Sequence, residues 1–320
     1  MLKPITGTWF EFHHHNLPEG KYWNPICRQF TDEQWETKVA EMASIGLKYI
    51  VLMASSMVYP DSCEAYFQTD IYPRAEMAAF DPMEALFRAA DRYEMKVFVG
   101  AGFYGFWQDT LNNMTSPAVT KRAFRAMEQL YARYGHHTSF SGWYLPDELG
   151  ICPYYPDKFI HYTNQYTWHG KSFDPSLQVL IAPYGTNMLK ADDLFVKQLE
   201  RLDCDIIAYQ DEVGVRKSTP LETPAYFEAL RKAHDKAGRA ALWADMEIFE
   251  FEGDVYQSAL IPASMERIER QIGSIAPYVD EILMYQYLGM FNKPQTQAFC
   301  GHPQSTQLYR DYVNWLNKRA

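Results

Sequence analysis

Eight short stretches of this chain are apolar at almost every position, and a segment with helical periodicity follows each of them. Apolar runs of this length, rich in β-branched and aromatic residues, are typical of strands in a parallel sheet that is covered by helices on its faces. The pattern predicts strands over residues 5–12, 47–53, 96–100, 140–145, 178–182, 204–209, 240–246 and 281–285.

The segments between these strands carry helix start and stop signals. Thr31 and Gln34 have the spacing of a capping box, and Asp81-Pro82 and Ser116-Pro117 each place a capping side chain before a proline. A glycine closes several of the helical segments, as at Gly135. Four of the later helices are predicted at 155–166, 224–236, 262–275 and 304–317.

An eightfold alternation of strand and helix predicts an α/β fold of the (β/α)8 type, the TIM barrel. No linker rich in glycine, serine or proline divides the 320 residues, so we expect residues 1–320 to form one single-domain barrel. A doubly wound open sheet is the structural alternative. It is disfavoured because the first strand is not followed by a glycine-rich phosphate loop, and residues 100–102 match that motif only in part.

The composition excludes several classes of partner. The net charge is −10 and there is no basic run, so neither nucleic acid nor an anionic membrane surface is expected to bind. No apolar run is long enough to span a membrane. The first strand follows the N-terminus without an apolar signal segment, which favours a cytoplasmic protein, although a chain whose leader had been removed for a periplasmic or secreted form would look the same.

The cysteines give little functional information. There are five cysteines, an odd number, at scattered positions. No CxxC pair is present that would indicate a zinc knuckle or a redox motif. Free thiols agree weakly with a reducing compartment. The sequence does not indicate an oligomeric state.

Two strand ends carry the acidic residues that we single out as catalytic candidates. In a (β/α)8 barrel the catalytic groups lie at the C-terminal ends of the strands. Strand 240–246 leads into Glu247, and because side chains alternate along a strand, Asp245 and Glu247 should point into the barrel together. Strand 140–145 leads into Asp147 and Glu148, and the same alternation places Glu148 on the face of Tyr144.

Two carboxyl groups that face each other across a barrel mouth are the machinery of glycoside hydrolysis. One, kept protonated by its surroundings, donates a proton to the leaving oxygen, and the other attacks the anomeric carbon or activates water. We assign Glu148 as the acid/base and Glu247 as the nucleophile of a retaining enzyme that acts on an oligosaccharide or glycoconjugate. The simpler interpretation is that each acid pairs with an arginine or caps a helix, since most acids are solvated surface groups.

Further polar and aromatic residues near strand ends are candidates for binding the carbohydrate. Gln210 and Asp211 follow the sixth strand, where they could bond sugar hydroxyls or hold the nucleophile in place, although Asp211 could equally cap the next segment. Tyr285 ends the eighth strand, where its hydroxyl could orient Glu247 or could simply belong to the barrel core. The substrate-binding candidates are Glu11, His13, Trp107, Asp147, Tyr184, Gln210, Asp211, Asp245 and Tyr285.

No metal or cofactor is expected from the motifs. The three histidines at 13–15 are adjacent and cannot all converge on one ion, and no HExxH motif with a third ligand is present. One of these histidines could instead bond a substrate hydroxyl.

Taken together, the strand-end residues resemble a family of barrels known as domain of unknown function 4434, which in turn looks like the clan A glycoside hydrolases. The likeness extends over nearly the whole chain, and it rests on residues 7–9, 142–148, 209–214 and 243–250. It implies that the acid/base follows the fourth strand and the nucleophile ends the seventh, which are the positions of Glu148 and Glu247. The chain departs from clan A at Asp147, where an asparagine that binds the 2-hydroxyl is usual.

Two other functions remain open on this fold, because the architecture hosts many chemistries. A metal-dependent sugar isomerase or epimerase would hold a divalent ion at Glu148, Asp211 or Glu247. A carbohydrate-binding barrel without catalysis would bind sugar with no turnover.

Overall fold

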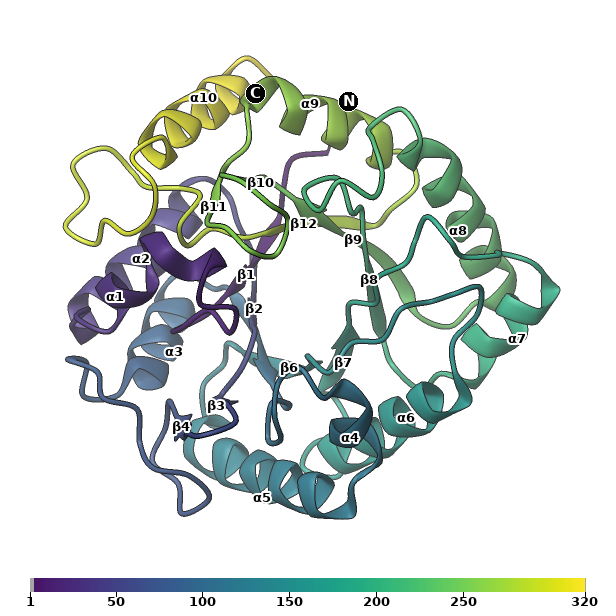
Figure 1. Cartoon of the computed structure of the whole chain (residues 1–320), viewed down its shortest axis with the longest axis horizontal. Coiled ribbons are helices and arrows are strands. Elements are labelled where there is room, and N and C mark those ends of the chain that lie inside the picture. Colours follow the sequence, from purple (N-terminus) through teal and green to yellow (C-terminus); the bar gives the residue numbers. More distant parts are fainter. Residues whose placement is uncertain (1–2, 320) are drawn as a thin grey trace.

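The computed structural model describes residues 3–319 and contains a closed barrel of eight parallel strands inside a ring of helices (Figure 1). Going around the barrel, the strands follow the order β1, β12, β9, β8, β7, β6, β5 and β2. Their bounds are Gly7–Phe10 (β1), Tyr49–Leu52 (β2), Lys96–Gly100 (β5), Phe140–Leu145 (β6), Gln178–Ile181 (β7), Ile206–Gln210 (β8), Ala241–Glu247 (β9) and Glu281–Tyr285 (β12). The prediction of a (β/α)8 barrel is therefore confirmed.

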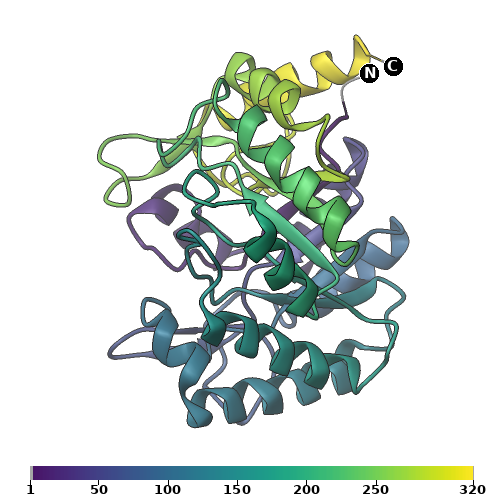
Figure 2. The same ribbon diagram turned by 90° about the vertical axis from the view of Figure 1, so that its right-hand side faces the viewer.

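Helices cover the outer face of the barrel, and the longer ones bury apolar side chains in the same core as the strands. The helices are α1 (Asn24–Cys27), α2 (Asp32–Ser44), α3 (Pro82–Arg92), α4 (Thr110–Thr115), α5 (Pro117–Tyr134), α6 (Asp157–Lys171), α7 (Asp193–Arg201), α8 (Thr223–Ala237), α9 (Met265–Ile275) and α10 (Ser305–Asn317), with a 3₁₀ turn at Glu19–Tyr22. The first and last segments meet, because the backbone N–H of Ile5 donates to the hydroxyl of Tyr312 in α10 at 3.0 Å, and both ends of the chain lie on the same side of the molecule (Figure 2). None of the helices within residues 3–319 has the length and apolar character that crossing a membrane requires.

Helix α6 is longer than the sequence predicts. It continues to Lys171 rather than ending at Tyr166, even though Gly170 interrupts the periodic pattern. The reason is a close approach: a Cβ at Gly170 would lie 2.6 Å from Cδ1 of Trp143 in β6. The glycine is needed for contact between helix and strand and does not end the helix.

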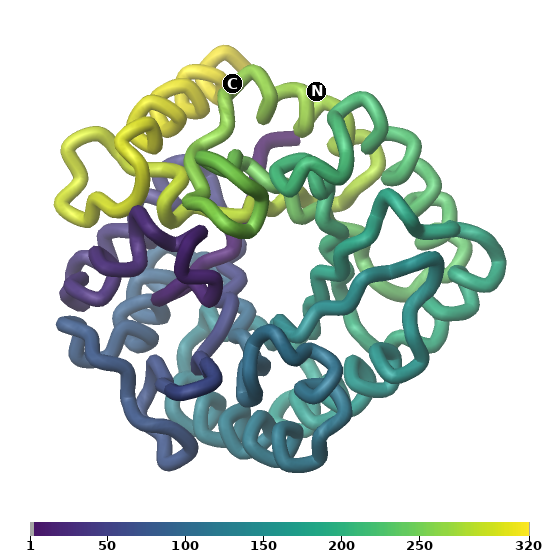
Figure 3. The backbone as a smooth tube through the Cα atoms, viewed as in Figure 1, coloured from purple at the N-terminus to yellow at the C-terminus, as the bar shows by residue number. Residues whose placement is uncertain are grey.

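Two short hairpins and the short helices α1 and α4 were not predicted. Strands β3 (Ser56–Val58) and β4 (Cys63–Ala65) pair antiparallel after β2, and β10 (Phe249–Phe251) pairs with β11 (Leu260–Pro262) after β9. Figure 3 shows the β10–β11 hairpin inside the ring of helices, next to the ends of β9 and β12. Because Pro262 is the last residue of β11, helix α9 begins at Met265, three residues later than predicted.

The register of the barrel decides which strand ends are neighbours. Gln210 at the end of β8 lies opposite Asp245 in β9, and Glu247 at the end of β9 lies opposite Tyr285 in β12. Four polar side chains from three adjacent strands are thereby brought to one side of the barrel mouth.

Candidate active site

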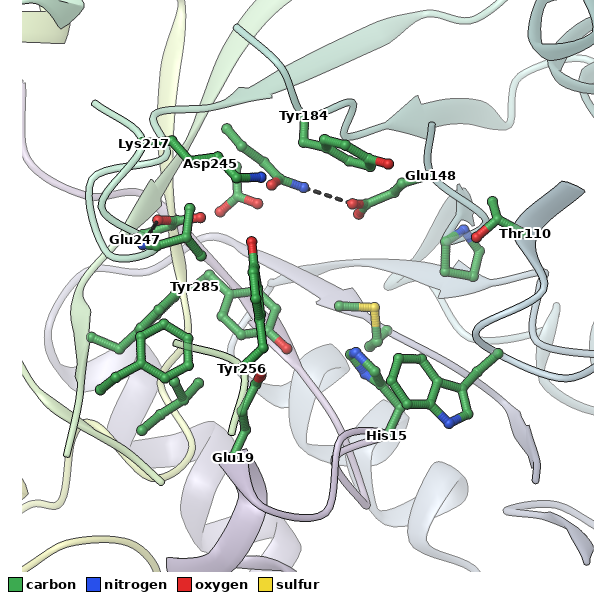
Figure 4. A pocket seen from close by; sticks show the side chains of 18 of the residues that line it. His15, Glu19, Thr110, Glu148, Tyr184, Lys217, Asp245, Glu247, Tyr256 and Tyr285 are labelled. Carbon is green, nitrogen blue, oxygen red and sulfur yellow. Dashed lines mark hydrogen bonds between the residues drawn. The ribbon is translucent and has the colours of Figure 1, made fainter. Parts of the chain in front are cut away.

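A cavity of about 370 Å³ opens at the C-terminal ends of the strands, where the polar strand ends meet (Figure 4). Four carboxyl side chains line it, together with a lysine and several aromatic rings. The lining residues are His15, Glu19, Met53, Phe103, Trp107, Thr110, Pro146, Glu148, Tyr184, Gln210, Val215, Lys217, Asp245, Glu247, Phe249, Phe251, Tyr256, Leu260 and Tyr285.

Glu148 enters the cavity from the loop after β6 and is held by two hydrogen bonds. The hydroxyl of Tyr144 donates to its Oε1 at 2.7 Å, and Nε2 of Gln210 donates to its Oε2 at 2.7 Å. Burial raises the pKa of Glu148 to about 7, although these two hydrogen bonds act in the opposite direction. This carboxyl group can therefore hold or release a proton near neutral pH.

Glu247 ends β9 and lies across the cavity from Glu148 in Figure 4. Its Oε2 accepts a hydrogen bond from the backbone N–H of Val215 at 2.8 Å. Burial and the nearby Asp211 carboxyl raise the pKa of Glu247 to about 8. The guanidinium of Arg267 donates to the backbone carbonyl of Glu247 at 2.9 Å and leaves its side chain free to face the cavity.

Asp245 lies between these two acids in Figure 4 and is the third carboxyl group of the cavity floor. It is 3% exposed, and its Oδ1 has no hydrogen-bond partner within the protein. Burial, followed by the charges of Glu148 and Glu247, raises its pKa well above the usual range for aspartate. The unpartnered oxygen of Asp245 is therefore available to a ligand.

Seven of the eleven residues proposed from the sequence line this one cavity. They are Trp107, Glu148, Tyr184, Gln210, Asp245, Glu247 and Tyr285. The alternation argument was right for β9, because Asp245 and Glu247 face the cavity while Leu242, Ala244 and Met246 are fully buried.

Asp147, proposed as a substrate-binding residue, does not line the cavity and is 2% exposed. Its Oδ1 accepts a hydrogen bond from Nδ2 of Asn113 in α4 at 2.7 Å, and its Oδ2 accepts one from the hydroxyl of Tyr162 in α6 at 3.3 Å. Asp147 therefore anchors the loop that presents Glu148.

Asp211 is also absent from the cavity wall and is 1% exposed. Its Oδ1 accepts from the backbone N–H of Glu247 at 3.1 Å, and its Oδ2 accepts from Nε2 of Gln271 in α9 at 2.7 Å. It lies behind Glu247 and positions the end of β9, so its proposed direct contact with substrate is not supported.

Glu11 and His13, the two candidates after β1, also lie outside the cavity. Glu11 accepts hydrogen bonds from Trp23 at 2.8 Å, Gln286 at 2.6 Å and His14 at 2.9 Å. Burial by itself would raise the pKa of Glu11, but the charge and hydrogen bonds of His14 outweigh it and lower the pKa to about 2. These residues form a buried network that supports the wall of the site.

His14 carries the positive charge of that network. Its Nδ1 binds Glu11 and its Nε2 lies 2.9 Å from Oε2 of Glu19. Burial would lower the pKa of His14, but Glu11 and Glu19 overcome this and raise it to about 10. The hydroxyl of Tyr285 lies 3.3 Å from this ring, so the structure links Tyr285 to His14 rather than to Glu247 as proposed.

Five polar residues of the cavity were not predicted from the sequence: His15, Glu19, Thr110, Lys217 and Tyr256. The ring of His15 lies 4.6 Å from that of Trp107, and Nζ of Lys217 lies 5.3 Å from the ring centre of Tyr184. His15 was within the histidine run that drew attention, but the chain leaves regular strand geometry after Phe10, so alternation no longer indicates which histidine faces inward. Lys217 and Tyr256 come from long loops without a motif.

Two clusters within residues 3–319 have the side-chain spacing to hold a metal ion: Glu11, His14 and His15, and Glu84, His136 and His137. Neither includes Glu148, Asp211 or Glu247, the residues at which a metal-dependent isomerase was envisaged.

Solved structures that share the fold have low sequence identity to this chain. One is described as a "putative alpha-L-fucosidase" from Bacteroides thetaiotaomicron, with a TM-score of 0.71 and 17% identity over 99% of this chain and 96% of that one. A glycoside hydrolase family 5 mannosidase from Rhizomucor miehei has a TM-score of 0.62 and 12% identity over 99% and 94%. An endo-1,4-beta-D-mannanase from Thermotoga petrophila has a TM-score of 0.62 and 9% identity over 98% and 100%.

At the level of sequence, comparison with curated proteins finds no match. A family model described as "Domain of unknown function (DUF4434)" matches residues 5–298.

Proposed function

The chain belongs to the DUF4434 family, and from that premise and the geometry of the cavity we propose that it is a glycoside hydrolase that cleaves an oligosaccharide or glycoconjugate. The observation that carries the proposal is the entry of Glu148 and Glu247 into one cavity from the ends of β6 and β9. The neighbouring solved structures described as mannosidase and mannanase support this choice among the chemistries of the barrel.

Each carboxyl group has a defined role in the proposed retaining reaction. Glu148 donates a proton to the glycosidic oxygen while Glu247 attacks the anomeric carbon, so that the bond to the leaving group breaks as a glycosyl–Glu247 ester forms. Glu148, now ionised, takes a proton from water as that water attacks the same carbon and releases Glu247.

The environment of Glu148 fits its role as the proton donor. A pKa of about 7 lets Glu148 carry its proton near neutral pH. Glu247 must be ionised to attack. The backbone N–H of Val215 and the charge of Arg267 favour that form, but burial and the charge of Asp211 outweigh them and raise its pKa to about 8. The positive charge that develops on the sugar ring in the transition state favours the carboxylate further.

The remaining lining residues are suited to bind a sugar. Trp107 and Tyr184 offer ring faces, and Gln210 and Asp245 offer polar atoms at the floor, next to the two acids. We propose that these four residues and Tyr285 contact the carbohydrate. Glu11, Asp147 and Asp211 act indirectly, through the side chains and loops that they hold, and His13 does not line the cavity.

A panel of aryl glycosides and polysaccharides tests the proposal. We expect hydrolysis of at least one substrate, and a fall in kcat of at least about 100-fold in both Glu148→Gln and Glu247→Gln. Glu252→Gln is the control, because Glu252 is an exposed acid that pairs with Lys21 outside the cavity. Full activity in either active-site variant would contradict the assignment.

The stereochemistry of the product distinguishes a retaining mechanism from an inverting one. Proton NMR of the first-formed sugar should show the anomeric configuration of the substrate if the enzyme is retaining. The opposite anomer would still show that the protein is a hydrolase, but it would contradict the assignment of Glu247 as the nucleophile. Sugar binding without any turnover would instead indicate a carbohydrate-binding barrel.

A further inference from the structure

The second cluster of possible metal ligands lies far from the active site in the fold. Glu84 is in the first turn of α3, and His136 and His137 follow α5, just before β6 begins at Phe140. The cluster is therefore at the N-terminal end of β6, whereas Glu148 follows its C-terminal end. His137 is 8% exposed, and His136 is exposed to solvent.

The orientation of the His137 ring is set by Asp91. Nδ1 of His137 lies 2.7 Å from Oδ2 of Asp91, and because a carboxylate only accepts, Nδ1 carries the hydrogen. The other oxygen of Asp91 accepts the backbone N–H of Ser139 at 2.8 Å, which fixes the carboxylate in turn. A carboxylate behind a histidine is the usual arrangement around a metal-ligating imidazole, since it fixes the tautomer and leaves the lone pair on Nε2.

The lone pair on Nε2 of His137 faces another acceptor. Oε2 of Glu84 lies 3.3 Å from it, so a proton or a cation is needed between the two atoms. Two ligands at about 2.0–2.1 Å from a tetrahedral zinc ion are themselves separated by about 3.3 Å. The spacing of Glu84 and His137 therefore already fits a shared ion.

His136 supplies a third ligand. Its ring centre lies 4.2 Å from that of His137, and the ligand atoms of Glu84, His136 and His137 are all within 4.8 Å of one another. Because His136 is exposed, a small rotation of its side chain brings a ring nitrogen closer at little cost. Water can complete the tetrahedron.

We propose that Glu84, His136 and His137 form a binding site for a zinc ion. Two imidazoles and one carboxylate suit Zn²⁺, whereas Ca²⁺ and Mg²⁺ prefer oxygen ligands throughout. The ion joins α3 to the connection between α5 and β6, so its role is to stabilise the barrel and not to take part in catalysis. The proposal is independent of the function proposed for the cavity.

The cluster of Glu11, His14 and His15 is a weaker candidate for zinc. Like His137, His14 has a carboxylate at each ring nitrogen, here Glu11 and Glu19. In this cluster, however, Glu11 and His14 are both buried, and Glu11 also accepts hydrogen bonds from Trp23 and Gln286. An ion there would have to displace a satisfied buried network, which is costly.

Isothermal titration of the metal-free protein with zinc chloride tests the site. We expect one ion per chain in the wild type, a loss of affinity of at least about tenfold in Glu84→Gln and His136→Ala, and a comparable loss in Asp91→Asn through the orientation of His137. His161→Ala, which removes an exposed histidine of α6, should bind like the wild type. Magnesium chloride should give no binding.

Thermal unfolding provides a second readout, because a ligand that binds only the folded state raises Tm. Zinc should raise the Tm of the wild type and of His161→Ala but not that of His136→Ala. The absence of stoichiometric binding to the wild type, or binding that survives in His136→Ala and Glu84→Gln but is lost in His15→Ala, would overturn the proposal.

Discussion

The hydroxyl of Tyr144 donates a hydrogen bond to Oε1 of Glu148 at 2.7 Å, so a residue inside β6 controls the proton of the carboxyl group that follows the same strand. The bond stabilises the ionised form of Glu148 and opposes the effect of burial on its pKa. Tyr144 therefore adjusts the acidity of the proposed acid/base from a fully buried position.

Tyr144→Phe should move the pH dependence of activity upward. Without the hydroxyl, the pKa of Glu148 rises above about 7, so the acid keeps its proton to higher pH and the alkaline limb of kcat/KM shifts in the same direction. A hydrogen bond to a charged group is worth about 1.5–3 kcal/mol, which corresponds to a shift of roughly one to two pH units. The pH profile of aryl glycoside hydrolysis measures it.

Tyr155→Phe is the matched control, because the hydroxyl of Tyr155 bonds Tyr209 and not a cavity acid. Its profile should coincide with that of the wild type. An alkaline limb that does not move in Tyr144→Phe, or that moves downward, would contradict the role of Glu148 as the proton donor.

Substitutions of Asp245 should separate a hydrogen-bonding role from a role of its charge. Because its pKa is raised well above the usual range, Asp245 is expected to be neutral and to offer a donor and an acceptor. Asp245→Asn keeps both, whereas Asp245→Ala removes them. We expect KM to rise about tenfold in the alanine variant, the effect of about 1.4 kcal/mol of lost binding, and to change much less in the asparagine variant.

Steady-state kinetics on one substrate gives both values for Asp245. A large and equal loss in the two variants would show instead that the negative charge of Asp245 is required.

Glu11→Gln should destabilise the fold strongly. The change leaves the buried His14 cation without one of its two countercharges, and breaking a buried ion pair typically costs about 3–5 kcal/mol. Urea denaturation at neutral pH measures the loss. Glu252→Gln, which breaks the exposed pair with Lys21, should leave the free energy of unfolding unchanged within error.

The pH dependence of this difference follows from the two pKa values. The pKa of Glu11 is lowered from 4.5 to about 2, so its contribution is complete above pH 4.5 and is lost as the pH falls towards 2. The pKa of His14 is raised from 6.5 to about 10, so its contribution is complete below pH 6.5 and is lost as the pH rises through 10. The difference in the free energy of unfolding between wild type and Glu11→Gln should therefore be greatest between pH 4.5 and pH 6.5. A difference that grows outside this range would be inconsistent with an ion pair between Glu11 and His14.

Gly170→Ala should destabilise the protein although alanine is the better helix former. The added Cβ meets Trp143 at 2.6 Å, and overpacking of this kind costs about 1–3 kcal/mol. Gly273→Ala is the control, because a Cβ at Gly273 in α9 meets no atom within 4 Å. This second change should stabilise the fold by about 0.4–1 kcal/mol, so thermal unfolding should give shifts of opposite sign.

The catalytic candidates could be predicted because they are at or next to regular strands. Alternation along β9 is sufficient to turn Asp245 and Glu247 towards the same side, and the closure of eight strands brings Glu148 to the same opening. Residues a few positions beyond a strand were predicted less well. His13 and His15 are two positions apart, so strand alternation would place them on the same face. Only His15 lines the cavity, because the chain no longer follows strand geometry after Phe10.

The amino-acid sequence by itself determined the barrel, its strand order and the side of the barrel to which its acids turn, since these depend on local periodicity and on the rule that parallel strands are joined by helices. Only the tertiary structure decided which polar side chains remain free. Asp147 accepts hydrogen bonds from Asn113 and Tyr162, Asp211 accepts one from Gln271, and Glu11 accepts from Trp23 and Gln286. A buried polar group binds whatever partner the packing brings within reach, and these partners come from helices and loops that no local pattern places beside it.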